Sequence, residues 1–273
     1  MSEPRPLVHG YPDFEGIGAR HFAQNQPEQP ETEKLLRNLR ALLGTVASDR
    51  QIAVIGCGPK PAILRDLIGR GLAAIGVEPV PDMVTSAREY VGCLDRVLHG
   101  SAESLPFGNG SLDVIVMESV LEHVESISRT LTECFRTLRP GGVLYVVTTN
   151  RLRLSLTGHS GEFRVAFYNW LPRLVQEGYV FRHLHHDPTL ANFSSRPAVH
   201  WFTYSDLCAH GRQAGFAQFY SLIDLLDASA PAVQRHWLRR RLLPLLQHQP
   251  WMRALALTQF GGSIFMFKRH DRQ

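Results

Sequence analysis

The stretch Gln51-Ile-Ala-Val-Ile-Gly-Cys-Gly-Pro-Lys60 decides the fold, because an apolar run breaks at two glycines and a proline where a helical pattern begins. This order predicts a buried strand, a tight turn and a helix that opens at Pro59. Gly56 and Gly58 lack a Cβ atom, so a ligand can approach the main chain closely at the turn. The first turn of a helix adds free N–H groups and the positive end of the helix dipole. Turns of this kind are typical of nucleotide-binding sites.

Three further apolar runs follow the glycine turn, at 72–78, 96–100 and 112–117, with helical patterns between them. Glu78 closes the first of these runs about 20 residues after Gly58, which is where a ribose-binding carboxylate stands in two-strand nucleotide sites. Strict alternation of strands and helices predicts a parallel sheet, whose carboxyl strand ends meet at one edge. The expected strands end on small or polar residues, namely Gly56, Glu78, Ser101 with Ala102, and Glu118.

In these segments the chain resembles the class I S-adenosylmethionine-dependent methyltransferases, in particular the small-molecule branch that includes quinone-biosynthesis and sugar-modifying enzymes. The resemblance covers residues 50 to 150 in unbroken order. It is carried by Val54-Ile-Gly-Cys-Gly-Pro59, Gly76-Val-Glu-Pro79, Ser101-Ala-Glu-Ser-Leu-Pro-Phe107, Leu112-Asp-Val-Ile-Val-Met117, Leu121-Glu-His123 and Leu138-Arg-Pro-Gly-Gly142.

The resemblance implies S-adenosylmethionine as cofactor and S-adenosylhomocysteine as its product. Gly56 and Gly58 would adjoin the methionine part, and Glu78 would hold the ribose hydroxyls. Ser101 and Ala102 would border the adenine. The full cofactor-binding set that we expect is Gly56, Cys57, Gly58, Glu78, Pro79, Met83, Ser101, Ala102 and Glu118.

The glycine turn departs from the family pattern at two positions. Val54 stands where an acid usually precedes the first glycine by two residues, and Lys60 stands at the third glycine-like position. Without the acid, the ammonium group of methionine loses a partner, so we expect weaker cofactor binding unless another group substitutes. Ser101 also replaces a common acid, but a hydroxyl can still accept a hydrogen bond from an adenine amino group.

The fold class that follows is α/β, a doubly wound seven-stranded sheet that is mostly parallel, with the antiparallel last strand that the resemblance implies. We expect an N-terminal lead-in and helix over 1–49 and a methyltransferase domain over 50–273, with insertions at about 150–202 and 228–260. The helices are predicted at 30–43, 81–91, 120–138 and 204–214, a turn at 139–142, and the remaining strands at 143–148, 216–223 and 261–268.

The insertion after the fifth strand faces the expected methyl group, because ligands of open α/β sheets bind beyond the carboxyl strand ends. Methyl transfer to a hydroxyl requires positioning of that oxygen and removal of its proton, for which histidine is suited. The candidates are His159, in the insertion, and His123, at the expected helix start. Ordinary structural roles, a loop hydrogen bond for His159 and a helix start for His123, are the alternatives.

Two other segments have both a functional and an ordinary interpretation. Residues 1–30, with Tyr11, His21 and Phe22, either form a mobile terminus or close over the cofactor as a lid that excludes water. Residues 232–258 combine tryptophans, leucines and arginines. They are expected to form a helical pair, broken at Pro244 and Pro250, that packs on the sheet or on a second subunit as a homodimer; contact with a membrane surface is the less favoured alternative.

Composition excludes several classes of function. A formal charge of +4 is too small an excess to indicate nucleic-acid binding. The four cysteines show no C-x-x-C spacing, and we interpret the run from His183 to Asp187 as a polar loop, so no metal is expected. With neither a secretory signal pattern nor an apolar run of membrane-spanning length, the chain is expected in the cytoplasm.

The sequence therefore predicts a methyltransferase that acts on an oxygen of a small-molecule acceptor, sugar-containing or lipid-linked, in natural-product or glycan biosynthesis. A loose likeness of Asn150-Arg151, Gly158-His159 and Trp170-Leu-Pro172 to sugar methyltransferases suggests the sugar. The alternatives are a non-catalytic protein that binds the cofactor for regulation or assembly, and an N-methyltransferase. An NAD-dependent oxidoreductase is disfavoured, because the turn lacks the third glycine.

Overall fold

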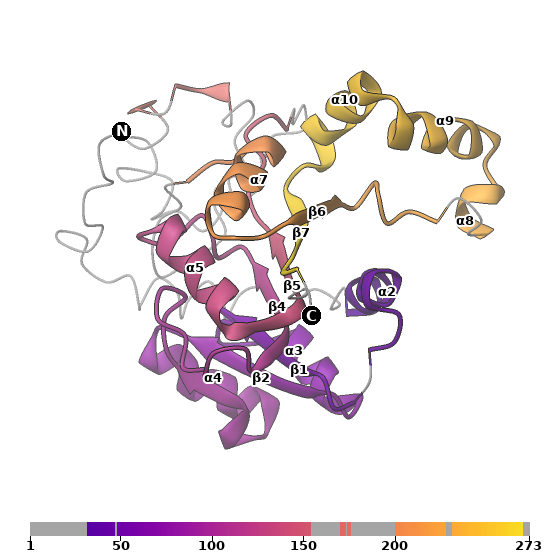
Figure 1. The fold of residues 1–273 in the computed structure, drawn as a ribbon. Helices are drawn as coiled ribbons and strands as arrows, with labels where there is room; N and C mark the ends of the chain where they lie inside the picture. Colours follow the sequence, from indigo (N-terminus) through magenta and orange to yellow (C-terminus); the bar gives the residue numbers. More distant parts are fainter. Residues whose placement is uncertain are drawn as a thin grey trace.

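The computed structural model describes residues 32–46, 48–153, 170–172, 174–175, 200–227 and 231–269 (Figure 1). In this part of the chain seven strands form one sheet in the order β3-β2-β1-β4-β5-β7-β6. All neighbours from β3 to β5 pair in parallel, whereas β7 is antiparallel to both β5 and β6. The predicted fold class is confirmed. The strands are β1 (Gln51–Ile55), β2 (Ala73–Glu78), β3 (Val97–His99), β4 (Leu112–Glu118), β5 (Leu138–Val147), β6 (Gln218–Ser221) and β7 (Ser263–Phe267).

The central strands are buried on both faces, which is why they appear in the sequence as nearly continuous apolar runs. In β1, Ile52 and Val54 pack on one face of the sheet, and Ala53 and Ile55 pack on the other. Each face therefore needs its own layer of helices, as in other doubly wound sheets.

The helices form these two layers. On one face lie α2 (Thr32–Leu43), α3 (Ala62–Gly69) and α4 (Pro81–Val91), and on the other lie α5 (Ile127–Thr137) and α7 (Tyr204–Gln213). A short 3-10 helix, η1 (Leu94–Arg96), precedes β3 and shortens the strand expected there. Thr203 caps α7 in a capping box with Asp206, so this helix begins where its sequence predicts.

Three short helices form an arm that projects to one side of the sheet: α8 (Pro231–Gln234), α9 (Trp237–His248) and α10 (Pro250–Phe260) (Figure 1). The predicted break at Pro250 is confirmed, since this residue opens α10. The predicted break at Pro244 is wrong, because α9 continues through it. Pro244 is exposed, so water can satisfy the carbonyl that loses its helical donor.

Two predicted helix starts are also wrong. α3 begins at Ala62 rather than Pro59, since a residue before proline, here Lys60, is disfavoured in helical conformation. The helix expected from residue 120 begins at Ile127, with Ser126 as its N-cap. Ser119 has a φ of +54°, which no right-handed helix accommodates, and a turn follows it.

The predicted turn at 139–142 lies inside β5 as the structure has it. Gly141 does bend sharply, with a φ of +80°. Its N–H donates to the Lys268 carbonyl over 2.9 Å, and the Lys268 N–H donates to the Gly142 carbonyl over 3.0 Å. These two bonds continue the pairing with the chain after β7, so the bend becomes part of the strand.

Candidate functional site

The strand order reverses between β1 and β4, and a cleft at the carboxyl end of these two strands is the usual ligand site of such sheets. Gly56 follows β1 with a φ of +61° and donates its N–H to the Val77 carbonyl over 2.7 Å. A Cβ at Gly56 would lie 2.5 Å from a methyl carbon of Val120, which follows β4. Only glycine fits here, because both the conformation and the close approach exclude a side chain.

Gly58 and Glu78 connect the ends of β1 and β2. The Gly58 N–H donates to one carboxylate oxygen of Glu78 over 2.9 Å, and the Val80 N–H donates to the other over 3.1 Å. Glu78 is only 4% exposed, so burial raises its pKa while the two N–H donors oppose that rise. A carboxylate has about four lone-pair sites, and these bonds use two of them. The carboxylate can therefore accept two more hydrogen bonds.

Gly58 borders open space. Its φ is +67°, and no heavy atom among the described residues lies within 4 Å of the position that a Cβ would occupy. A ligand can thus lie directly against this peptide, which a side chain would otherwise cover.

Cys57 contributes its main chain alone to this turn. Its sulfur lies 2.9 Å from the position that a Cβ on Gly76 would take, so the side chain packs toward β2. Burial, together with the charge of Glu78, raises the pKa of the thiol to about 12. A neutral, inward thiol is neither a nucleophile nor a metal ligand.

The residues after β3 form the far wall of the predicted site. The Ser101 hydroxyl donates to Glu103 over 2.8 Å, and Glu103 accepts the Glu125 N–H over 2.8 Å. Ala102 is buried at 7% exposure, a small apolar surface suited to the edge of a planar ring. This hydrogen-bonded chain fixes Ser101 relative to the turn that follows β4.

Pro79 and Met83 lie at the start of the connection from β2 into α4. Pro79 is exposed, and its carbonyl accepts a hydrogen bond from Nε2 of His99 over 3.0 Å. Met83 is half-buried in the first turn of α4. The contacts of Pro79 and Met83 with the cofactor remain predictions.

The turn after β4 contains a buried acid that sequence analysis did not single out. Glu122 is 1% exposed and accepts a hydrogen bond from the Thr148 hydroxyl over 2.5 Å. Burial raises its pKa to about 7, although the Thr148 bond acts in the opposite direction. An acidic residue between the apolar Leu121 and Val124 is the signal that could have identified it.

His123, in the same turn, is half-buried, and Glu118, the last residue of β4, is half-buried as well.

The chain returns to this edge after the insertion. Asn150 pairs with Phe202 in a parallel bridge, and the Thr149 hydroxyl donates to the His200 carbonyl over 3.2 Å. The His200 N–H donates to the Glu122 carbonyl over 3.3 Å. Both ends of the insertion therefore lie beside Glu122. His159, the lid residues Tyr11, His21 and Phe22, and the run from His183 to Asp187 fall outside the described residues.

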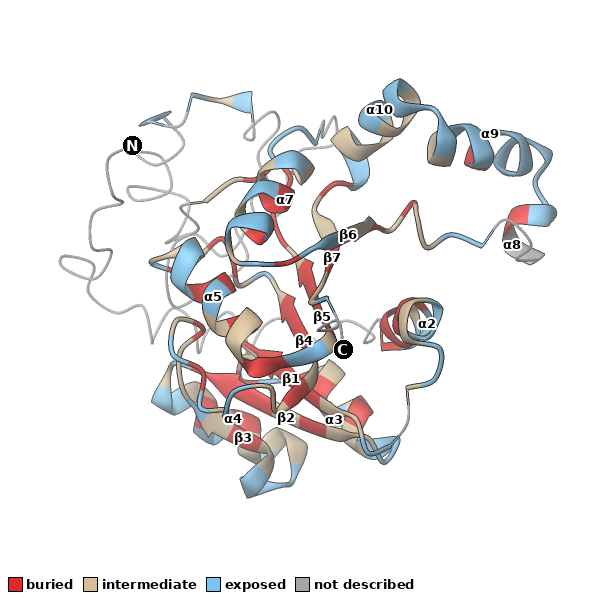
Figure 2. Ribbon diagram, viewed as in Figure 1, coloured by how far each residue is buried: buried red, intermediate tan, exposed pale blue. Residues whose placement is uncertain are grey.

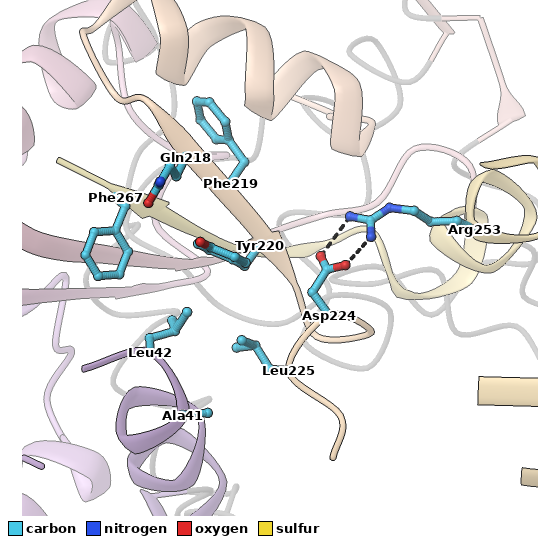
Figure 3. Close-up of a pocket in the computed structure, with 9 residues that line it drawn as sticks. All are labelled: Ala41, Leu42, Gln218, Phe219, Tyr220, Asp224, Leu225, Arg253 and Phe267. Carbon is cyan, nitrogen blue, oxygen red and sulfur yellow. Dashed lines mark hydrogen bonds and ion pairs between the residues drawn. The ribbon is translucent and has the colours of Figure 1, made fainter. Parts of the chain in front are cut away.

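A hollow lies beside the edge of the sheet that β7 and β6 form, far in strand order from Glu78. It has a volume of about 620 Å³ between α2, β6, β7 and α10, with Leu42, Tyr220 and Phe267 along it (Figure 3). Asp224 and Arg253 form an ion pair at one end of it. Among the described residues no group of three or more His, Cys, Asp or Glu side chains is arranged to hold a metal ion.

Comparison with known proteins agrees with this geometry. A family model described as a methyltransferase domain matches residues 53–146, which include most of β1, all of β2, β3 and β4, and most of β5. A probable S-adenosylmethionine-dependent methyltransferase of Mycolicibacterium smegmatis is 34% identical over 108 residues, 39% of this chain and 40% of that protein. The mitochondrial ubiquinone biosynthesis O-methyltransferase of Bos taurus is 28% identical over 166 residues, 55% of this chain and 42% of that protein.

Among solved structures, phosphoethanolamine N-methyltransferase 2 of Haemonchus contortus, in complex with S-adenosyl-L-methionine, has the same fold with a TM-score of 0.54. It is 15% identical, over 95% of this chain and 58% of that one. The chain spans about four-tenths of the length of the first curated relatives it matches. Glu78 with two free lone-pair sites and the open face of Gly58 fit the ribose and methionine parts of the cofactor. Residues 53–146 therefore form a methyltransferase domain of the class I S-adenosylmethionine-dependent kind.

Proposed function

We propose that this chain transfers the methyl group of S-adenosylmethionine to an oxygen atom of a small molecule, sugar-containing or lipid-linked, in the cytoplasm. The observation that carries the proposal is the Gly58 N–H bond to the buried Glu78 carboxylate beside open space at the strand ends. The cofactor, when bound, supplies a methyl group on a positively charged sulfur. The chain's own task is to hold that group and the acceptor oxygen in line and to remove a proton.

On the cofactor side, Glu78 would accept hydrogen bonds from the ribose hydroxyls at its two remaining lone-pair sites. Val54 is buried on the face of the sheet that α2 and α3 cover, so nothing at this position can pair with the methionine ammonium group. Glu118 is a carboxylate at the end of the neighbouring strand β4, one residue beyond the pair of Ile55 with Met117 and therefore beside Gly56 rather than Val54. We assign Glu118 the role that an acid at position 54 would have.

On the acceptor side, we assign removal of the hydroxyl proton to His123. Its imidazole is half-buried in the turn after β4, and histidine can accept a proton near neutral pH. Glu122 acts as a positioning residue for that turn. Its carboxylate is bound to Thr148 and its carbonyl to His200, which ties the turn to the end of β5 and to the insertion. Oxygen as the methylated atom is supported by two relatives named as ubiquinone biosynthesis O-methyltransferases.

The test is a methyl-transfer assay with radiolabelled S-adenosylmethionine and pairs of acceptors that share one skeleton and differ in carrying a hydroxyl or an amine. The proposal predicts transfer to hydroxyl members alone. Transfer to amine members alone would make the chain an N-methyltransferase. Intact binding of S-adenosylhomocysteine with no transfer to any acceptor would favour the non-catalytic alternative, which the departures at Val54 and Lys60 motivate.

A further inference from the structure

Most of α9 and much of α10, in the arm of α8, α9 and α10 (residues 231–260), are exposed (Figure 2). Several of these exposed residues have large apolar side chains. In α9 the one buried residue is Leu243, and α10 has none, although both helices are fully described. The most exposed of the apolar side chains are Trp237 at 67%, Leu238 at 50%, Trp251 at 68%, Leu255 at 65% and Phe260 at 58%. So many exposed apolar groups in one short segment indicate a binding surface.

The same arm has a uniform charge. Between Ala228 and Arg269 the sequence contains no Asp or Glu, while residues 231–260 contain five arginines. Asp224, outside the arm, pairs with Arg253. The other four arginines, Arg235, Arg239, Arg240 and Arg241, are exposed. The partner of this surface must therefore offer both negative charge and an apolar phase.

We propose that this arm lies in the surface of a membrane that contains anionic lipids. Tryptophan and leucine side chains would enter the boundary between headgroups and acyl chains, and the arginines would pair with lipid phosphates. No described helix is long and apolar enough to cross a bilayer, which leaves the interfacial arrangement.

Two other partners fit less well. A nucleic acid would neutralise the arginines but would leave the exposed leucines in water. A second copy of the chain, joined through the same surface on both subunits, would bring eight exposed arginines together without one carboxylate from either arm.

The arm is fixed to the end of the sheet where the acceptor is expected. Arg253 pairs with Asp224, which follows β6 (Figure 3). The Gln247 side-chain amide donates to the carbonyls of Ile223 and Leu226, over 3.0 Å each. The Asn150 amide donates to the carbonyls of Leu257 and Thr258 over 3.2 and 3.0 Å. Membrane contact would therefore hold the carboxyl end of β5 near the lipid. If the proposed function is right, the methyl acceptor would then be a molecule located in the membrane.

Cosedimentation of the full chain with vesicles tests the proposal, without cofactor or acceptor. We expect binding to phosphatidylcholine vesicles with about three-tenths phosphatidylglycerol, and at least about tenfold weaker binding to pure phosphatidylcholine or at high salt. The double variant Arg239→Gln/Arg240→Gln should weaken binding to the anionic vesicles about tenfold. Its matched control, Arg37→Gln/Arg40→Gln on the exposed side of α2, removes the same charge and should change it less than about twofold.

Trp251→Ala tests the apolar part of the proposal, with Leu94→Ala, 71% exposed on η1, as control. The arm variant should lose binding and the control should retain it. Equal binding to neutral and anionic vesicles, no binding to either, or equal losses in arm and control variants would overturn the proposal. So would a dimer in sedimentation velocity that arm variants convert to monomers without any vesicle binding. Titration with S-adenosylhomocysteine is independent of all these outcomes, so failure here is distinguishable from failure of the proposed function.

Discussion

The backbone N–H of Gly58 donates to the carboxylate of Glu78 over 2.9 Å, across 20 residues of chain. This bond places the acid of the second strand over the glycine turn of the first, and leaves part of the carboxylate available to a ligand. Because Gly58 also faces open space, the cofactor's ribose and its amino-acid part can be held by neighbouring groups of one small surface.

Glu78→Gln should weaken binding of S-adenosylhomocysteine by about 10- to 100-fold, as measured by isothermal titration. The amide oxygen can still accept from Gly58, but the amide nitrogen would then face the Val80 N–H, donor against donor. The control is Glu89→Gln, an exposed acid on α4, which should leave affinity unchanged. Equal affinity in both variants would remove Glu78 from the site.

Gly56→Ala should lower the free energy of unfolding by about 2 kcal/mol, because the new methyl group would meet Val120 in a backbone conformation that disfavours a side chain. Adding Val120→Ala removes the collision and not the strain, so urea unfolding should show that about half of the loss is recovered. A double variant no more stable than Gly56→Ala would show that Val120 is not the obstacle.

The buried Glu122 makes stability depend on pH. Burial raises the pKa of Glu122 to about 7 in the folded chain, from an ordinary value of 4.5. The folded chain therefore binds this proton more tightly than the unfolded chain does. The stabilisation is therefore complete below about pH 4.5 and is lost as pH rises to about 7, by on the order of 3 kcal/mol.

Glu122→Gln has no proton to lose, so its free energy of unfolding should fall less than that of the natural chain between these pH values. Urea unfolding at several pH values measures the difference, and the other titrating groups cancel because both chains share them. Parallel pH profiles for the two chains would contradict the buried position of Glu122.

His123→Ala should lower kcat by about 10²- to 10⁴-fold and leave the affinity for S-adenosylhomocysteine within about twofold, since the role we propose for the imidazole is to take a proton from the acceptor. His248→Ala, exposed at the end of α9, is the control. A full kcat in His123→Ala, measured at saturating acceptor, would return His123 to a purely structural role and direct attention to His159.

The sheet and its glycine turn could be predicted because several local signals agree. β1, β2 and β4 are apolar on both faces, and each ends on a residue that the parallel fold brings to one edge. The helix starts at Ala62 and Ile127 could not be predicted from apolar spacing. They depend on the proline that follows Lys60 and on the backbone conformation of Ser119, neither of which apolar spacing records.

Glu122 illustrates the limit for the site. A single acid in a Leu-Glu-His turn can point to solvent or inward. The inward position of Glu122 depends on a hydrogen bond from the Thr148 hydroxyl, 26 residues later in the chain. Similarly, Asn150 holds α10 through carbonyls more than 100 residues away in the sequence, and no local pattern encodes that contact.

Isothermal titration of S-adenosylhomocysteine into Gly58→Ala and Gly92→Ala, side by side with the natural chain, tests the central claim most directly. Both glycines have φ near +70° and no described atom within 4 Å of an added Cβ, so the backbone strain is matched. We predict micromolar-range binding by the natural chain and by Gly92→Ala, and none by Gly58→Ala. Absence of binding by the natural chain, or unchanged binding by Gly58→Ala, would contradict the account.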